Sequence, residues 1–179
     1  MNFQSTILTI PGIGGSGPAH WQSLWEKEHG FTRVEQRDWD TPNCAEWVEA
    51  INNHVQNFVP SNLIVVAHSA ACVAFMHWVQ KYNVIIKGAL LVAPADADAA
   101  SFPGGTTGFA PVPMIELPFP SIVVTSSNDH FVTLERAKQF ADAWGSDFIN
   151  IGEAGHINVA SGFGEWEHGL TILKRLDSL

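Results

Sequence analysis

Residues 63–71, Leu-Ile-Val-Val-Ala-His-Ser-Ala-Ala, decide how this sequence is interpreted. The first five form a continuous apolar run, which is typical of a strand buried on both faces of a sheet. The small, mostly apolar residues from Ala70 to Tyr82 predict a helix that starts directly after Ser69. A serine at such a tight strand-to-helix turn is the pattern of a nucleophile elbow. Ala67 and Ala71, two residues before and after it, are small enough for strand and helix to pass closely there.

Strands and helices alternate along the rest of the chain. Strands are predicted at residues 6–11, 34–38, 85–92, 122–125 and 148–151. Helices are predicted at residues 18–29, 43–58, 133–144 and 165–176. Apolar strands separated by helices indicate a mostly parallel sheet covered by helices on both faces. We therefore expect an α/β three-layer sandwich of about six strands, and the 179 residues suit a single domain over residues 1–179.

A serine that merely caps a helix after a strand gives a similar local pattern, so the elbow needs partners elsewhere in the chain. Asp129 follows the fifth predicted strand and His156 follows the sixth. The order Ser, Asp, His is that of the catalytic triad in doubly wound hydrolases, and all three residues fall at the carboxyl edge of the sheet. Asp96, after the fourth strand, is the main alternative acid. Glu153 is a weaker alternative, because it lies only three residues before His156 on the same loop.

The other histidines show no tight ligand pair, so we expect no metal site. His68 is adjacent to the serine, and neighbouring residues of a strand point to opposite faces. A structural role is therefore expected for His68.

The glycine-rich segment Gly12-Ile13-Gly14-Gly15-Ser16-Gly17 allows two interpretations. It has the form of a dinucleotide-binding fingerprint between a strand and a helix, with Asp38 as a candidate ribose acid. In a hydrolase, the same glycines let backbone N–H groups approach the oxyanion that develops during acyl transfer. The second interpretation is favoured for two reasons. The first interpretation leaves the order Ser, Asp, His unexplained, and a nicotinamide enzyme would normally need a longer chain to include a substrate domain.

Composition excludes several other classes of protein. The net charge is −9, with 9 Lys and Arg against 18 Asp and Glu, which disfavours binding to nucleic acid or to an anionic membrane. The apolar segment near the N-terminus is too short for a signal peptide, and no run of 18 apolar residues predicts a membrane span. Cys44 and Cys72 do not form a disulfide framework. These features predict a cytoplasmic protein.

Residues 94–120 break the alternation, with five prolines at positions 94, 103, 111, 113 and 118 and a sixth at 120. A loop of this length is often functional, so it is interpreted as a flap over a pocket or as a passive crossover. Phe102, Phe109 and Met114 are candidate pocket walls, as is Trp21, which suits the core equally well.

These motifs together resemble the small α/β-hydrolases of the retinoblastoma-binding serine hydrolase type, which includes bacterial members. The resemblance covers nearly the whole chain. It is carried by Pro11–Ser16 with His20-Trp21, by Ala67-His68-Ser69, by Leu91–Pro94, by Ser126–Asp129 with Leu134–Ala137, and by Gly152–Asn158 with Ser161–Gly164. Two departures are Ala70-Ala71, where such proteins usually carry Leu-Gly, and His130, where proline often follows the acid.

The resemblance implies a minimal α/β-hydrolase fold without a lid domain, in which Ser69 is the nucleophile, Asp129 the acid and His156 the base. We expect a carboxylesterase-like enzyme that cleaves small acyl esters without a cofactor. The backbone N–H groups of Ile13 and Ala70 are the expected oxyanion donors, with Gly14 as an alternative to Ile13. The alternative function is a protein-interaction module on an idle hydrolase fold, since the family is linked to partner binding as well as to hydrolysis.

Overall fold

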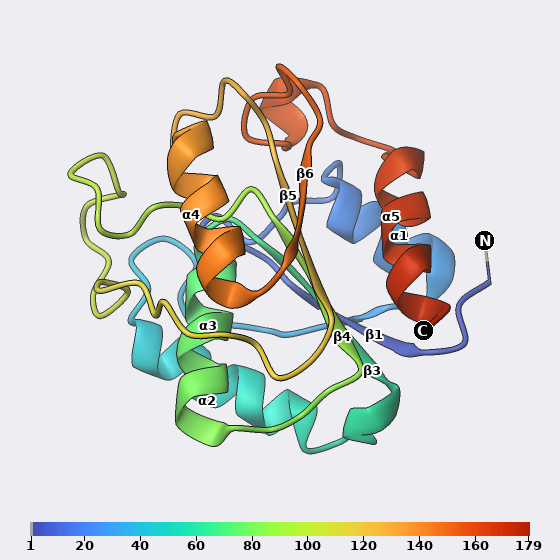
Figure 1. Ribbon diagram of the computed structural model, residues 1–179. Helices are drawn as coiled ribbons and strands as arrows, with labels where there is room; N and C mark the ends of the chain where they lie inside the picture. The colour runs from blue at the N-terminus through green and yellow to red at the C-terminus, as the bar shows by residue number, and fades with distance from the viewer. Residues whose placement is uncertain (1) are drawn as a thin grey trace.

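A six-stranded sheet runs through the centre of the computed structural model, which describes residues 2–179 (Figure 1). All neighbouring strands pair in parallel, in the order β2-β1-β3-β4-β5-β6. The strands are β1 (Thr6–Ile10), β2 (Thr32–Arg33), β3 (Leu63–His68), β4 (Gly88–Val92), β5 (Ser121–Thr125) and β6 (Asp147–Asn150). The prediction of a parallel α/β sheet is confirmed.

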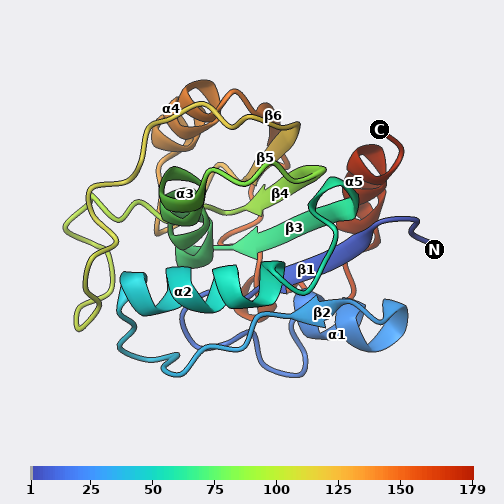
Figure 2. The same ribbon diagram turned by 90° about the horizontal axis from the view of Figure 1, so that it is seen from below.

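Helices cover both faces of the sheet (Figure 2). One face carries α1 (Trp21–His29) and α5 (Glu167–Asp177), and the other carries α2 (Cys44–Val55), α3 (Ala70–Tyr82) and α4 (Leu134–Trp144). Two short 3-10 helices, η1 (Pro60–Asn62) and η2 (Val159–Ser161), lie in connecting segments. Among residues 2–179, no helix combines the length and the apolar character that a bilayer crossing requires.

Strand β3 lies in the interior, and all six of its residues are buried. Side chains alternate across a strand. Leu63, Val65 and Ala67 accordingly pack in the core beneath α2, α3 and α4. Ile64 and Val66 pack in the second core, beneath α1 and α5. Burial on both faces explains why this strand is a continuous apolar run in the sequence.

The structure corrects some predicted boundaries. Helix α1 begins at Trp21 rather than Pro18, because His20 is the N-cap and its Nδ1 accepts a hydrogen bond from the Gln22 N–H. The strand predicted at residues 34–38 is wrong: β2 is Thr32–Arg33, and the chain leaves the sheet after the Val34 N–H donates to Thr9 O.

The segment from residue 94 to 120 contains no helix or strand, as predicted. Phe109 is buried in the core beneath α2, with its ring centroid 5.6 Å from that of Trp47. His77 Nε2 lies 2.9 Å from Phe109 O. This aromatic residue therefore anchors the loop to the helical layer.

Gln22 joins α1 to the sheet and to the glycine-rich loop. Its side chain is fully buried, and Nε2 donates to Ile10 O at 3.2 Å and to Val66 O at 3.1 Å. Its Oε1 accepts a hydrogen bond of 2.7 Å from Ser16 Oγ. One amide thus fixes the position of the glycine-rich loop relative to β1 and β3.

Replacing Gln22 with Leu is predicted to destabilise the protein. The change removes all three hydrogen bonds, and each buried polar group left unpaired costs about 1–3 kcal/mol. We expect a loss of about 2 kcal/mol or more, which lowers the thermal midpoint by about 4–8 °C. The control is Gln80→Leu on the exposed face of α3, which should shift the midpoint by much less. Equal midpoints for the two variants would contradict this role.

Candidate active site

Ser69 occupies a strained turn between β3 and α3. Its backbone angles are φ 60° and ψ −129°, a conformation that costs energy for any residue with a side chain. The Ser69 N–H donates to Val92 O at 3.0 Å, which ties the turn to β4. The turn has the form of the predicted nucleophile elbow, and Ala67 and Ala71 beside it are fully buried.

Gly12 lies against this turn. A Cβ built on Gly12 would meet His68 O and Ser69 Cβ, each at 2.9 Å. The close approach follows from the register of β1 and β3, which pairs Ile10 with Ala67. A glycine is therefore required at position 12 so that the first loop can lie beside the serine.

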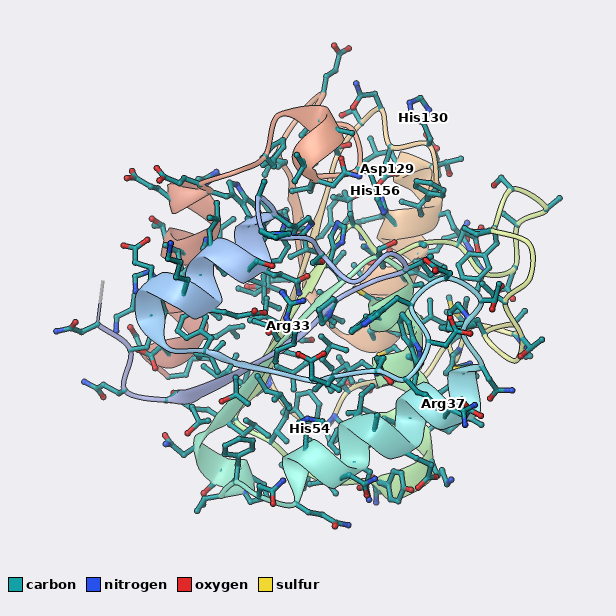
Figure 3. All side chains as sticks on the ribbon, turned by 180° about the vertical axis from the view of Figure 1, so that it is seen from behind. Arg33, Arg37, His54, Asp129, His130 and His156 are labelled. Atoms are coloured by element: carbon teal, nitrogen blue, oxygen red, sulfur yellow. The ribbon has the colours of Figure 1, made fainter. Side chains whose placement is uncertain are left out.

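Three side chains from separate loops form a connected chain of hydrogen bonds. Ser69 Oγ lies 2.8 Å from His156 Nε2. His156 Nδ1 lies 2.9 Å and 2.8 Å from the two carboxylate oxygens of Asp129. The Asp129 side chain is fully buried, whereas Ser69 is partly exposed. Figure 3 shows Asp129 and His156 next to each other and His130 at the outer edge.

The loops that carry the acid and the histidine are held together by further hydrogen bonds. Asn128 Oδ1 accepts from the Gly155 N–H at 2.7 Å, and Ser126 Oγ donates to Gly155 O. The Phe131 N–H donates to Asp129 Oδ1 at 2.9 Å. These contacts fix Asp129 relative to His156. Sequence analysis missed Asn128 as a contributor, although it lies directly before the predicted acid.

His68 contacts the backbone of the loop that carries His156. Its Nε2 lies 3.0 Å from His156 O, and because a carbonyl only accepts, this nitrogen donates. Burial lowers the pKa of His68 well below its ordinary value, and His156 and His20 nearby lower it further. His68 is thus a neutral, buried residue that contacts the backbone of His156, in agreement with the predicted structural role.

Neither alternative acid contacts His156. The Asp96 carboxylate lies 3.3 Å from Arg136 Nε, and its neighbour Asp98 lies 2.6 Å from Arg136 Nη2. Glu153 is exposed to solvent. Asp129 is the carboxylate that the fold brings to the histidine.

The glycine-rich loop presents its backbone beside Ser69. The Gly14 N–H donates to Trp39 O at 2.9 Å, so this alternative oxyanion donor is already engaged. Ile13 N–H has no acceptor among residues 2–179. Ala70 is the first residue of α3, where backbone N–H groups lack a partner within the helix. The two donors expected from the sequence are therefore both available.

Arg33 holds this loop in place, a role that sequence analysis did not predict. Its guanidinium donates to Gly15 O at 2.7 Å and to Ser16 O at 3.2 Å, and it pairs with Glu26 at 2.9 Å. Arg33 is labelled near the centre of the view in Figure 3.

A cavity of about 220 Å³ opens beside Ser69. It is lined by Ile13, Gly14, Ser16, Gly17, His20, His68, Ser69, His156, Asn158, Val159 and Ala160. The prediction that Phe102, Phe109 and Met114 wall this pocket is wrong. Phe109 belongs to the core, and none of the three lines the cavity. Trp21 is fully buried and belongs to the core beneath α1, where its Nε1 donates to Ile157 O at 2.8 Å.

A family model for serine hydrolases matches residues 7–175. The chain belongs to the serine hydrolase family. A protein of Pectobacterium atrosepticum described as a YdeN-like hydrolase is 33% identical, with 97% of this chain and 90% of that chain covered and a TM-score of 0.85. No curated protein sequence matches the chain.

More distant structures share the fold of this serine hydrolase. The YdeN protein of B. subtilis is 17% identical, with 98% of this chain and 100% of that chain covered and a TM-score of 0.75. The esterase RhEst1 of a Rhodococcus species is 12% identical, with coverages of 97% and 90% and a TM-score of 0.71.

Membership of the serine hydrolase family removes the dinucleotide interpretation of the glycine-rich loop. The Asp38 carboxylate, its candidate ribose acid, accepts hydrogen bonds from the N–H groups of Asp40 and Thr41 at 2.9 Å and 3.0 Å. Within residues 2–179, no group of three His, Cys, Asp or Glu side chains is arranged to hold a metal ion.

Replacing Gly12 with Ala is predicted to displace the elbow. The added methyl group would overlap the backbone at His68 and the side chain of Ser69, so the serine must move relative to His156. We expect the rate at which a fluorophosphonate labels the protein to fall by about tenfold or more, since misplacement by about 1 Å can cost 10²-fold.

The control for Gly12 is Gly104→Ala in the segment 94–120, where a Cβ would meet nothing within 4 Å and which does not line the cavity beside Ser69. This control should label at nearly the rate of the unmodified protein. Labelling of the Gly12 variant at the control's rate would show that the close approach does not position the serine.

Proposed function

We propose that this serine hydrolase is a carboxylesterase-like enzyme that cleaves small acyl esters through Ser69, His156 and Asp129. The observation that carries the proposal is the continuous contact from Ser69 Oγ through the His156 ring to the buried Asp129 carboxylate. The cavity of about 220 Å³ beside Ser69 supports a small substrate.

In the proposed mechanism, Ser69 Oγ attacks the ester carbonyl while His156 Nε2 takes the hydroxyl proton. Asp129 holds the Nδ1–H tautomer and stabilises the imidazolium that forms. The tetrahedral oxyanion accepts hydrogen bonds from the N–H groups of Ile13 and Ala70, and loss of one such donor costs about 10²-fold or more in turnover. The carbon–oxygen bond to the alcohol then breaks, and the alcohol leaves with the proton from His156.

The acyl-enzyme is hydrolysed by the same groups. A water molecule gives a proton to His156 as it attacks the acyl carbon, and the second tetrahedral species collapses. Ser69 leaves with that proton, and the carboxylic acid is released. The step consumes one water and returns all three residues to their starting state.

We further propose that the chain is a single cytoplasmic domain of the retinoblastoma-binding serine hydrolase type. The motif blocks from Pro11 to Ser16 and from Gly152 to Asn158 support the type. Cys44 and Cys72 are both free, as is typical of proteins in a reducing compartment. Burial raises the pKa of Cys44 to about 12, so its thiol is unreactive.

Replacing Asp129 with Asn is predicted to lower kcat by about 10³-fold or more, because the amide neither fixes the Nδ1–H tautomer nor stabilises the imidazolium. The measurement is hydrolysis of p-nitrophenyl acetate and butyrate. Asp96→Asn is the matched control, since Asp96 pairs with Arg136 instead. A larger loss in the Asp96 variant would reverse the assignment of the acid.

Replacing Ser69 with Ala is predicted to abolish both ester turnover and labelling by a fluorophosphonate. The labelled peptide of the unmodified protein, identified by mass spectrometry, should contain Ser69. A protein-interaction module on an idle fold would instead show no Ser69-dependent turnover with any short ester. Labelling that persists in the Ser69 variant would refute the nucleophile.

A further inference from the structure

The cavity beside Ser69 has a polar but uncharged lining. No Lys, Arg, Asp or Glu is among its lining residues, and two of its histidines besides His156 are held neutral. Burial lowers the pKa of His20 to about 4, and the nearby Arg33 and His156 lower it further. Burial likewise lowers the pKa of His68. The cavity therefore suits an uncharged group.

The position of the His20 proton follows from its contacts. His20 is the N-cap of α1, and its Nδ1 accepts a hydrogen bond of 3.2 Å from the Gln22 N–H. A neutral imidazole carries one proton, so the proton of His20 is on Nε2. His20 thus presents an N–H donor.

This donor has no acceptor in the protein. His20 is 5% exposed, and its buried Nε2 has no hydrogen-bond partner among residues 2–179. Its ring lies among other aromatic rings, with centroid distances of 4.9 Å to His68 and 5.1 Å to Trp21. The N–H of His68, by contrast, is already bonded to His156 O. Buried donors are rarely left unpaired, so an unpaired donor on a residue that lines the cavity points to a ligand atom.

We propose that His20 is a specificity-determining residue whose Nε2–H donates to an oxygen of the substrate. The preferred substrates are short, uncharged esters that carry an ether, hydroxyl or carbonyl oxygen close to the scissile ester group. A cavity of about 220 Å³ has the volume of roughly seven water molecules at about 30 Å³ each, which suits a short substrate group. This inference rests on the proposed function, since it takes Ser69 as the nucleophile.

The test compares esters that differ by one oxygen in place of one methylene group. On the acyl side, the pair is p-nitrophenyl methoxyacetate and p-nitrophenyl butyrate. On the alcohol side, the pair is 2-methoxyethyl butyrate and butyl butyrate, whose hydrolysis is measured by the release of butyric acid. For each pair the quantity is the ratio of kcat/KM for the oxygen-containing ester to that for the plain ester. Comparing this ratio between variants cancels the intrinsic reactivity of the esters.

Two kinds of variant distinguish the effect of losing the Nε2–H donor from the effect of losing the N-cap of α1. His20→Asn keeps a side-chain oxygen that can cap the Gln22 N–H but lacks a donor at the position of Nε2. His20→Ser is a second variant that retains a cap, in case the first folds poorly. His20→Gln places an amide N–H near the position of Nε2 and should restore the preference.

His29→Asn is the matched control. Its Nε2 is also buried without a hydrogen-bond partner, but it lies at the far end of α1, about 13 Å along the helix axis from His20. Thermal midpoints establish that each variant is folded.

We expect the ratio for at least one ester pair to fall about twofold to tenfold in the Asn and Ser variants and to return in the Gln variant. The pair that responds identifies the side of the ester on which the oxygen lies. Ratios equal to those of the unmodified protein in both cap-retaining variants would overturn this inference. Ser69-dependent hydrolysis of the plain esters would then leave the proposed function standing. If none of the four esters shows Ser69-dependent hydrolysis, the proposed function fails and this inference fails with it.

Discussion

The geometry of the site depends on the contact between Gly12 and the strained turn at Ser69. Parallel pairing of β1 with β3 brings the ends of these strands together, so the loops after them must share one small space. The turn projects Ser69 Oγ over the edge of the sheet, and the absence of a side chain at Gly12 lets the first loop approach it. The positions of Ser69, the proposed nucleophile, and of the backbone N–H groups beside it therefore follow from one packing constraint. The energetic cost of the strained backbone at Ser69 is offset by the hydrogen bond from its N–H to Val92 O on β4 and by the packing of the buried helix α3.

Polar side chains then fix the loops relative to one another. Gln22 and Arg33 hold the glycine-rich loop, whereas Asn128 and His68 hold the loop that carries His156. Each of these four side chains bonds to a partner on another element. The geometry of the candidate site is thus built from fixed contacts, which would reduce the reorganisation needed during the proposed reaction. The same arrangement leaves the Nε2–H of His20, a residue that lines the cavity beside Ser69, without a partner among residues 2–179.

The sequence predicted the sheet and the three principal residues because both leave regular signals. Strands buried on both faces are continuous apolar runs, and residues that follow parallel strands meet at one edge of the sheet. Ser69, Asp129 and His156 could therefore be expected to meet from their order and their positions after strands, with Asp96 and Glu153 as alternative acids. Side chains that bond to distant backbone groups leave no periodic signal, so Arg33 and Asn128 were missed. Gln22, which is buried with Trp21 and Trp25 on α1, was missed as well.

Other errors arose where tertiary contacts override local preference. Pro18 suits the start of a helix, but His20 provides the cap that starts α1. The strand expected at residues 34–38 is absent because the chain turns away from the sheet edge after Val34. Phe109 is apolar in a loop rich in proline and was interpreted as a pocket wall, yet it fills space beneath α2. From the sequence alone, an apolar residue in a long loop gives no indication of which surface it covers.

The most direct measurement is a crystal structure of the protein after reaction with a small fluorophosphonate. We expect a phosphorus atom bonded to Ser69 Oγ, with its phosphoryl oxygen within hydrogen-bond distance of the N–H groups of Ile13 and Ala70. A label on another residue would contradict the account, as would a phosphoryl oxygen that points away from both donors.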